Sequence, residues 1–507
     1  MQLIRCILIL VAAASCVVGS AWGQGIKRGS KPPEYAYADG LLRAAQGSAA
    51  SVQPPMNAAL LFAVGRARSI AGDKKTAKGL FERAYNSLNG FSDKDARGVS
   101  ALWRELTAQT TTLDPDYVQE NLPSEPTERE IAIEALVRHY IARDELQKAI
   151  ALSESMLSPY RVAGELMSHT SKEQKMERRR IFSIALAAYQ KNPPDYITAG
   201  SSEDFGSLLL SVWRDVPAED VLEAIDKLLD QARSDESSPR PLIDGATITL
   251  RSANKVTVFN SYYQLRVSQV LPILDERDPS KAETIRQSMQ FTPNEFPNQG
   301  GRAKPITYQI AFSRSSAVSA AASATNDAQL EEIKSEVQCN AGKLRAHLSS
   351  LPSPNSKARA LLSLAERCQA EQREEAINAL NTLTGIENSG VSWELWTEAA
   401  TLSATLQQAE IARRLLKRAD TTIGKLYDSD SDKDDPNKAL KFYWPSTAAW
   451  CREVSVARMV SIPDAREVLE SIPDSEIKAV TTVALAQALL GQKTQPMESP
   501  IVYKPKD

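Results

Sequence analysis

Residue types that commonly carry out chemistry are sparse in this chain of 507 residues. Its three histidines, His139, His169 and His347, do not lie at metal-ligand spacing from one another. The sequence also has no glycine-rich phosphate loop, nucleophile elbow or dinucleotide-binding turn. We therefore interpret the histidines as structural or surface residues, and we predict no catalytic residue, no metal and no cofactor.

Two serine–lysine pairs have the spacing found in penicillin-binding enzymes. They are Ser252 with Lys255, and Ser475 with Lys478. The partner motifs of those enzymes are absent, and Ser475 is better explained by a helix that starts at Asp474. Neither serine is predicted to be a nucleophile.

Two runs of charge could bind ions or partners. The acidic run 428–432 resembles the opening of a calcium loop, but Lys433 and Ala439 stand where that loop needs glycine and glutamate. We interpret this run as a solvated connector before a helix that starts after Pro436. The three arginines at 178–180 are interpreted as one exposed helix segment.

The N-terminus has the pattern of a secretory signal. Arg5 precedes an apolar run over 6–18 that is too short to span a bilayer, and small residues follow it. We predict a signal peptide over 1–23 with cleavage before Gln24, or alternatively after Ala21. The protein is therefore expected in a bacterial periplasm or outside the cell.

Lipid anchoring through Cys16 is an alternative to simple cleavage, because Ala13-Ala14-Ser15 precede that cysteine. No later segment approaches the ~20 apolar residues of a membrane span. The 60 basic and 63 acidic residues are nearly balanced. This balance gives no reason to expect nucleic acid or an anionic membrane as a partner.

Three cysteines follow the signal, namely Cys339, Cys368 and Cys451. This number is odd and small for an exported chain, so the chain is not a disulfide scaffold. The favoured interpretation is buried thiols that act as small apolar residues. The alternative is a bridge between Cys339 and Cys368.

Helical periodicity dominates the chain, and it repeats. In residues 57–89, small and aromatic residues fall where two antiparallel helices would touch, at Gly65, Ala77, Phe81 and Ala84. Gly72 and Asp73 supply the turn. Glycine inside a helix costs ~1 kcal/mol relative to alanine, so we expect a close helix contact at Gly65.

Three further units repeat this pattern, over 130–156, 357–383 and 393–419. Ala77 and Ala149 are 72 residues apart, which is twice the 36 residues between Ala376 and Ala412. These units resemble tetratricopeptide repeats, although Val137 stands where the family has a small residue. The resemblance implies an all-α fold, a right-handed α-solenoid of antiparallel helix pairs.

The breaks in periodicity give the domain boundaries. We predict helical arrays over 31–290 and 306–490, a linker rich in proline and glycine over 291–305, and a flexible tail over 491–507. A short β-hairpin is expected near 246–259.

Several helix starts and two further helices can also be predicted. We expect capping boxes at Thr127 and Ser280, with Asp278 before Pro279 as another cap. Asp464 and Asp474 are expected to cap the helices of a terminal hairpin that ends near residue 490. Helices are expected over 306–324 and 327–348.

The resemblance implies that the first helix of each unit lines a concave face where a partner binds. Arg66 and Arg138 fall at equivalent positions of the first two units, so they are the candidate partner-binding residues. The predicted function is a non-enzymatic exported scaffold that binds protein or peptide. One alternative is a helical toroid acting on polysaccharide or cell wall through paired carboxylates, and another is a lipid-anchored envelope accessory protein.

Overall fold

The computed structural model describes residues 33–89, 91, 98–192, 205–236, 248–252, 255–259, 262–289, 311–312, 339–431 and 440–492. The predicted signal, linker and most of the tail lie outside these residues. Within them the chain is predominantly helical, as the all-α prediction requires. No described helix combines the length and apolarity that crossing a bilayer would need.

The N-terminal half contains thirteen of the described helices. They are α2 (Pro33–Ala49), α3 (Met56–Ile70), α4 (Lys74–Asn89), α5 (Val99–Leu113), α6 (Pro115–Glu120), α7 (Pro126–Ala142), α8 (Leu146–Ser153), α9 (Tyr160–His169), α10 (Lys175–Lys191), α11 (Phe205–Val212), α12 (Ala218–Glu236), α13 (Tyr262–Arg277) and α14 (Pro279–Met289). Short strands β1 (Ile248–Ser252) and β2 (Lys255–Phe259) pair antiparallel in the range of the expected hairpin.

The C-terminal half contains eight α-helices and two 3₁₀ turns among the described residues. They are α16 (Ala341–His347), η1 (Leu348–Ser350), α17 (Pro354–Cys368), α18 (Arg373–Leu383), α19 (Trp393–Thr405), α20 (Ala409–Asp430), η2 (Lys441–Tyr443), α21 (Pro445–Val460), α22 (Ile462–Ser471) and α23 (Ser475–Leu489). Strand β3 (Ala311–Phe312) pairs with β1 inside the helix expected over 306–324, so that expectation is wrong at these two residues. In the helix expected over 327–348, the described part becomes helical only at Ala341, because Asn340 caps it there.

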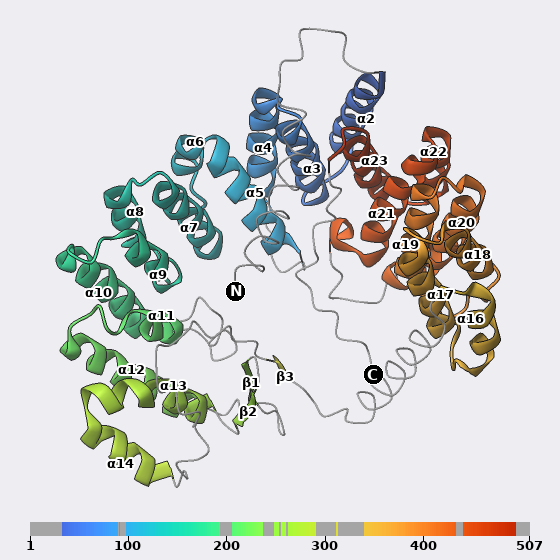
Figure 1. The fold of residues 1–507 in the computed structure, drawn as a ribbon. Helices are drawn as coiled ribbons and strands as arrows, with labels where there is room; N and C mark the ends of the chain where they lie inside the picture. Colours follow the sequence, from blue (N-terminus) through green and yellow to red (C-terminus); the bar gives the residue numbers. More distant parts are fainter. Residues whose placement is uncertain are drawn as a thin grey trace.

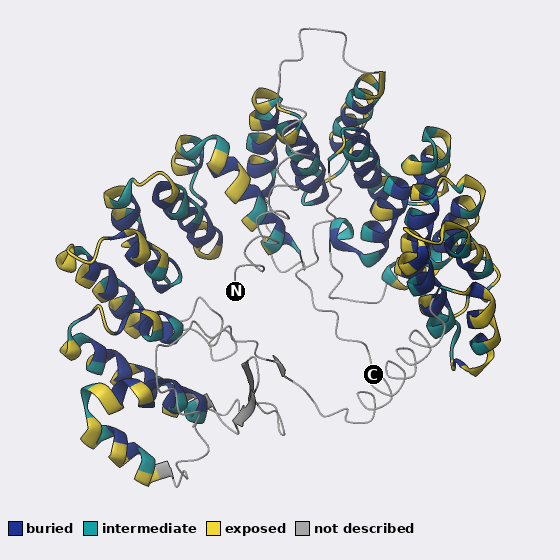
Figure 2. Cartoon of the chain, viewed as in Figure 1, coloured by how far each residue is buried: buried dark blue, intermediate teal, exposed yellow. Residues whose placement is uncertain are grey.

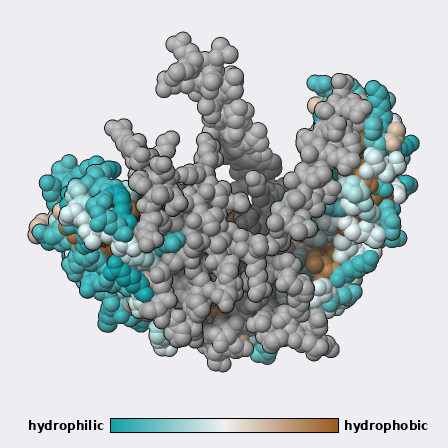
Figure 3. All heavy atoms as spheres, turned by 90° about the horizontal axis from the view of Figure 1, so that it is seen from below, coloured by the Kyte–Doolittle hydropathy of each residue, from teal (hydrophilic) through white to brown (hydrophobic). Residues whose placement is uncertain are grey.

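Helices pack mainly against the next helix or the next but one in the chain, apart from α2, and the four predicted units are the pairs α3–α4, α7–α8, α17–α18 and α19–α20. The helices follow an arc in two rows (Figure 1). An inner row holds α17, α19, α21, α23, α3, α5, α7, α9, α11 and α13. Buried faces lie between neighbouring helices, and exposed faces point outward (Figure 2). On the face seen in Figure 3, hydrophilic residues cover most of the described surface.

Gly65 allows the close contact expected in the first pair. A Cβ atom at this position would lie 2.6 Å from Cε1 of Phe81 and 3.3 Å from Cβ of Leu80. Only hydrogen at Gly65 therefore lets the buried Phe81 ring lie against the backbone of α3. The turn between these helices is the predicted one, with Gly72 at φ +86°.

The two halves of the chain meet through their ends. Helix α2 packs along α23 and also against α3 (Figure 1). Near this junction, the buried ring of Tyr443 in η2 lies against Gly98, where a Cβ atom would come within 2.6 Å of Cδ2 of the ring. The halves predicted as separate arrays are thus in contact, although nothing in the repeat pattern indicates it.

A disulfide joins Cys339 to Cys368, with 5.5 Å between their Cα atoms. The favoured interpretation of these two residues as free thiols is therefore wrong, and the alternative holds. The bridge ties Cys339, two residues before α16, to the last residue of α17. Cys451 remains a buried thiol, and burial raises its pKa to about 12.

Three of the expected helix caps are wrong, at Thr127, Asp464 and Ser280. Glu125 rather than Thr127 caps α7, because Pro126 is the first helical residue and the Glu125 carboxylate accepts from the amide of Glu128. Ser461 rather than Asp464 caps α22, since its hydroxyl accepts from the Asp464 amide. The Asp474 cap of α23 is confirmed, as its carboxylate accepts from the amides of Glu476 and Ile477.

At the start of α14, Asp278 rather than Ser280 accepts the backbone hydrogen bond. Its Oδ1 atom accepts from the Lys281 amide at 3.1 Å, and the Ser280 hydroxyl donates to the same atom at 2.6 Å. These bonds and the adjacent Lys281 charge lower the pKa of Asp278. Of the two caps expected here, Asp278 is confirmed and Ser280 is wrong.

Candidate interaction surface

The inner row of the arc carries both candidate arginines, Arg66 on α3 and Arg138 on α7. Arg66 interacts electrostatically with Glu105 on α5, the next inner helix. Burial raises the pKa of Glu105, and the positive charge of Arg66 opposes that increase. Arg66 thus faces an acid on the following inner helix.

Arg138 has the same arrangement two inner helices further along the arc. Its guanidinium lies 3.0 Å from Glu134 on its own helix and 3.5 Å from Glu165 on α9, the next inner helix. Arg161 of α9 reaches back to Glu134 at 3.5 Å. The side chains of Arg138 and Glu165 are each 42% exposed, so solvent or a partner can reach them.

The alternative of a carbohydrate-cleaving enzyme needs paired carboxylates, and two carboxylates of α7, Glu130 and Glu134, lie one helical turn apart. Both have structural partners. Glu130 accepts hydrogen bonds from the backbone amides of Leu157 and Ser158, at 2.7 and 2.8 Å. Glu134 is held by Arg138 and Arg161. This pair stabilises the α7–α9 contact.

The histidines are placed apart from one another. His139 lies edge-on to the ring of Tyr140, and burial lowers its pKa. His169 and His347 are the last residues of α9 and α16. Within the described part of the chain, no three or more histidine, cysteine, aspartate or glutamate side chains gather so that they could hold a metal ion.

The arginine run at 178–180 is not one exposed segment, which corrects the sequence interpretation. Arg178 is buried, donates to the carbonyls of Met167 and Thr170, and pairs with Asp215 at 2.7 Å. Arg179 pairs with Glu219 of α12, and Arg180 pairs with Glu154, the residue that follows α8. Together the three arginines hold consecutive helix pairs together.

The acidic run is also partly helical, because α20 continues to Asp430. The Asp430 carboxylate accepts from the amide of Ser446 at 2.9 Å, near the start of α21. The rest of the expected connector and the start after Pro436 lie outside the described residues. Of the two serines at serine–lysine spacing, Ser252 ends β1 and Ser475 begins α23 after its cap.

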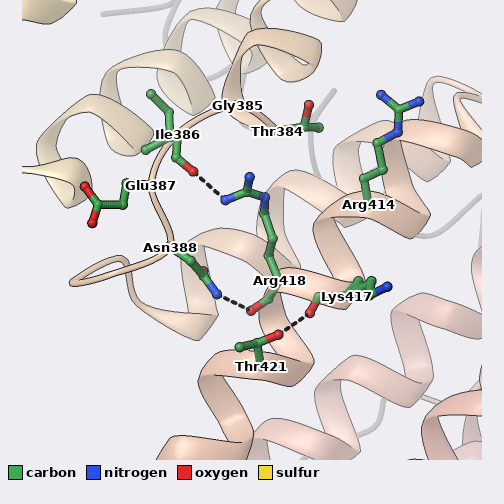
Figure 4. Close-up of a pocket in the computed structure, with 9 residues that line it drawn as sticks. All are labelled: Thr384, Gly385, Ile386, Glu387, Asn388, Arg414, Lys417, Arg418 and Thr421. Carbon is green, nitrogen blue, oxygen red and sulfur yellow. Dashed lines mark hydrogen bonds between the residues drawn. The ribbon is translucent and has the colours of Figure 1, made fainter.

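An open groove of about 540 Å³ lies between the loop that follows α18 and the middle of α20 (Figure 4). Arg418 points to the loop, donates to the carbonyl of Ile386, and stacks 5.2 Å from the ring centre of Trp396. Arg414 and Lys417 extend away from the loop (Figure 4). The arginine that faces this groove is therefore used to position the loop.

No family model matches the chain, and no curated protein matches it either. The resemblance to tetratricopeptide repeats and the partner-binding role of Arg66 and Arg138 stay predictions.

Proposed function

We propose that this protein is an exported scaffold, a tetratricopeptide-like α-solenoid that binds a protein or peptide along its inner row. The observation that carries the proposal is that arginines of two inner helices interact with acids of the next inner helix: Arg138 pairs with Glu165, and Arg66 acts electrostatically on Glu105. Solvent-exposed ion pairs contribute less than about 1 kcal/mol each. A charged partner can therefore replace such a contact at little cost.

Export is supported by the N-terminal signal pattern and by the Cys339–Cys368 disulfide. Disulfides persist in oxidising compartments and are rare in reducing ones. The extended row of helices also supports scaffolding, because an arc of helix pairs offers a long surface to a partner.

Peptide selection tests the proposal. The chain from Gln24 onward is used to select from a displayed random peptide library, and the affinities of the enriched peptides are measured. We expect Arg138→Glu to weaken binding at least tenfold. The control is Arg180→Glu on the outer helix α10, since Arg180 is likewise half-exposed and paired with a carboxylate; it should change affinity less than twofold. Equal effects of the two variants, or no enriched peptide, would contradict the proposal.

A further inference from the structure

Helix α2 forms its helix pair with a helix that lies far from it in the sequence. In the other helix pairs of the described residues, the outer helix follows its inner helix along the chain, as α4 follows α3 and α20 follows α19. The inner partner of α2 is α23, the last described helix (Figure 1). One helix pair of the arc is thus assembled from the two ends of the described chain.

Polar contacts fix α2 on both sides. Glu34 accepts from Arg458 of α21 at 3.1 Å, and the Tyr37 hydroxyl accepts from Arg466 of α22 at 2.8 Å. The Arg466 guanidinium also lies 4.9 Å from the centre of the Tyr37 ring. On the other side, Asp39 pairs with the largely buried Arg68 of α3.

The apolar face of α2 is small. Its buried residues are Ala38, Leu42, Ala45 and Ala49, so that leucine is the one large side chain among them. Gly40 and Gly47 have no atom within 4 Å of an added Cβ, so they weaken the helix without permitting a close contact. A helix of this length and composition is not stable in isolation. Its helical state therefore depends on α23 and α3.

We propose that α2 is a separable clasp, and that α21, α22, α23 and α3 form a helix-binding groove for it. The groove fits a helix whose buried residues are mostly small. Three polar contacts set its spacing: an acid at position i, an aromatic residue at i+3 and a second acid at i+5. In α2 these are Glu34, Tyr37 and Asp39. Contacts such as Glu34–Arg458 join residues 424 apart in the sequence. The clasp therefore closes only after α23 is in place.

Exchange of the clasp tests this proposal in the whole mature chain. A protease site is inserted into the connection at residues 50–55, the folded protein is cut, and a fluorescent peptide of residues 33–49 is added. We expect the cut protein to keep its helical circular dichroism and to bind the peptide in place of its own α2. Leu42→Asp in the peptide should weaken binding at least tenfold. Ala44→Asp places the same charge at an exposed position and should change binding less than threefold.

A second measurement concerns the groove itself. Arg466→Ala in the cut protein should weaken the wild-type peptide but leave a Tyr37→Ala peptide unaffected, because the contact is then already lost. The proposal is overturned if the cut protein unfolds, if the labelled peptide does not bind, or if the Leu42→Asp and Ala44→Asp peptides bind equally.

Discussion

At Gly65, the absence of a side chain sets how closely α3 and α4 approach. A methyl group there would overlap the ring of Phe81, which is fully buried and cannot turn aside freely. Gly79 on α4 offers a contrast, because an added Cβ would meet no atom within 4 Å. The two glycines have the same intrinsic cost in a helix but different surroundings.

We therefore expect opposite effects from the two alanine variants. Gly65→Ala should lower the free energy of unfolding by about 1–3 kcal/mol, because the gain in helix propensity is smaller than the cost of overpacking. Gly79→Ala should raise it by up to about 1 kcal/mol. Chemical denaturation of both variants measures the difference. If Gly65→Ala instead raised the free energy of unfolding, the contact between Gly65 and Phe81 would have room for a methyl group, which would contradict the prediction.

Glu453 of α21 has a fully buried carboxyl group without a hydrogen-bond partner in the described residues. Burial raises its pKa well above the usual value, and the nearby Asp420 raises it further. The folded state therefore holds a proton that the unfolded state releases near its ordinary pKa. Stability is unaffected by Glu453 at low pH and decreases as pH rises above the unfolded pKa.

Glu453→Gln should remove this pH dependence. We expect the variant and the parent to be similar near pH 4, and the variant to be more stable by more than about 1 kcal/mol at pH 7. Urea denaturation at both pH values measures the change. A constant difference across this range would mean that Glu453 titrates normally in the folded protein.

At the scale of elements, two arginines of α10 contact other parts of the helical array, and their side chains differ greatly in exposure. The side chain of Arg178 is 8% exposed and donates to two carbonyls and Asp215, whereas that of Arg180 is 51% exposed and pairs with Glu154. Arg178→Met removes the hydrogen-bond donor to the Met167 and Thr170 carbonyls and the ion-pair partner of Asp215.

Arg178→Met should therefore lower the unfolding free energy by about 3–5 kcal/mol. Arg180→Met should change it by less than about 0.5 kcal/mol, as expected for an exposed pair. Thermal denaturation followed by circular dichroism compares them. Similar losses in both variants would refute the structural role assigned to Arg178.

The Cys339–Cys368 bridge spans 29 positions at the first described helices of the C-terminal half. Replacing both cysteines with serine should destabilise these helices by about 2–4 kcal/mol, mainly through the unfolded state. Hydrogen exchange should then become faster in α16 and α17 but not in α23. Unchanged exchange in α16 would mean that packing alone holds these helices.

Sequence reasoning predicted elements well where local chemistry determines them. Gly72 makes the turn after a helix because it adopts a positive φ, and Asp474 starts a helix because its carboxylate accepts backbone hydrogen bonds. The structure confirms both predictions. Sequence reasoning failed at Thr127, because the adjacent proline moved the first turn, and at Arg178, because burial depends on distant helices. The pairing of Cys339 with Cys368 likewise depends on how α16 and α17 pack.

At the scale of the whole molecule, repeat spacing predicted the four helix pairs but not the contact between α2 and α23. Periodicity reports which residues face a neighbour, and it does not identify that neighbour when it lies more than 400 residues away. The inner-row arginines were found through their equivalent positions in the repeat. Their acidic partners, Glu105 and Glu165, have no signal of their own in the sequence.

The central claim is that α23 and α2 form one helix pair of the arc. Circular permutation tests it most directly: Gln492 is joined by a short flexible linker to Pro33, and new termini are opened between Gly300 and Gly301. If α2 follows α23 as each outer helix follows its inner helix, the permuted chain should fold with the same helical circular dichroism and at least the parent's melting temperature. A permuted chain that loses its helical signal, or melts well below the parent, would contradict the account.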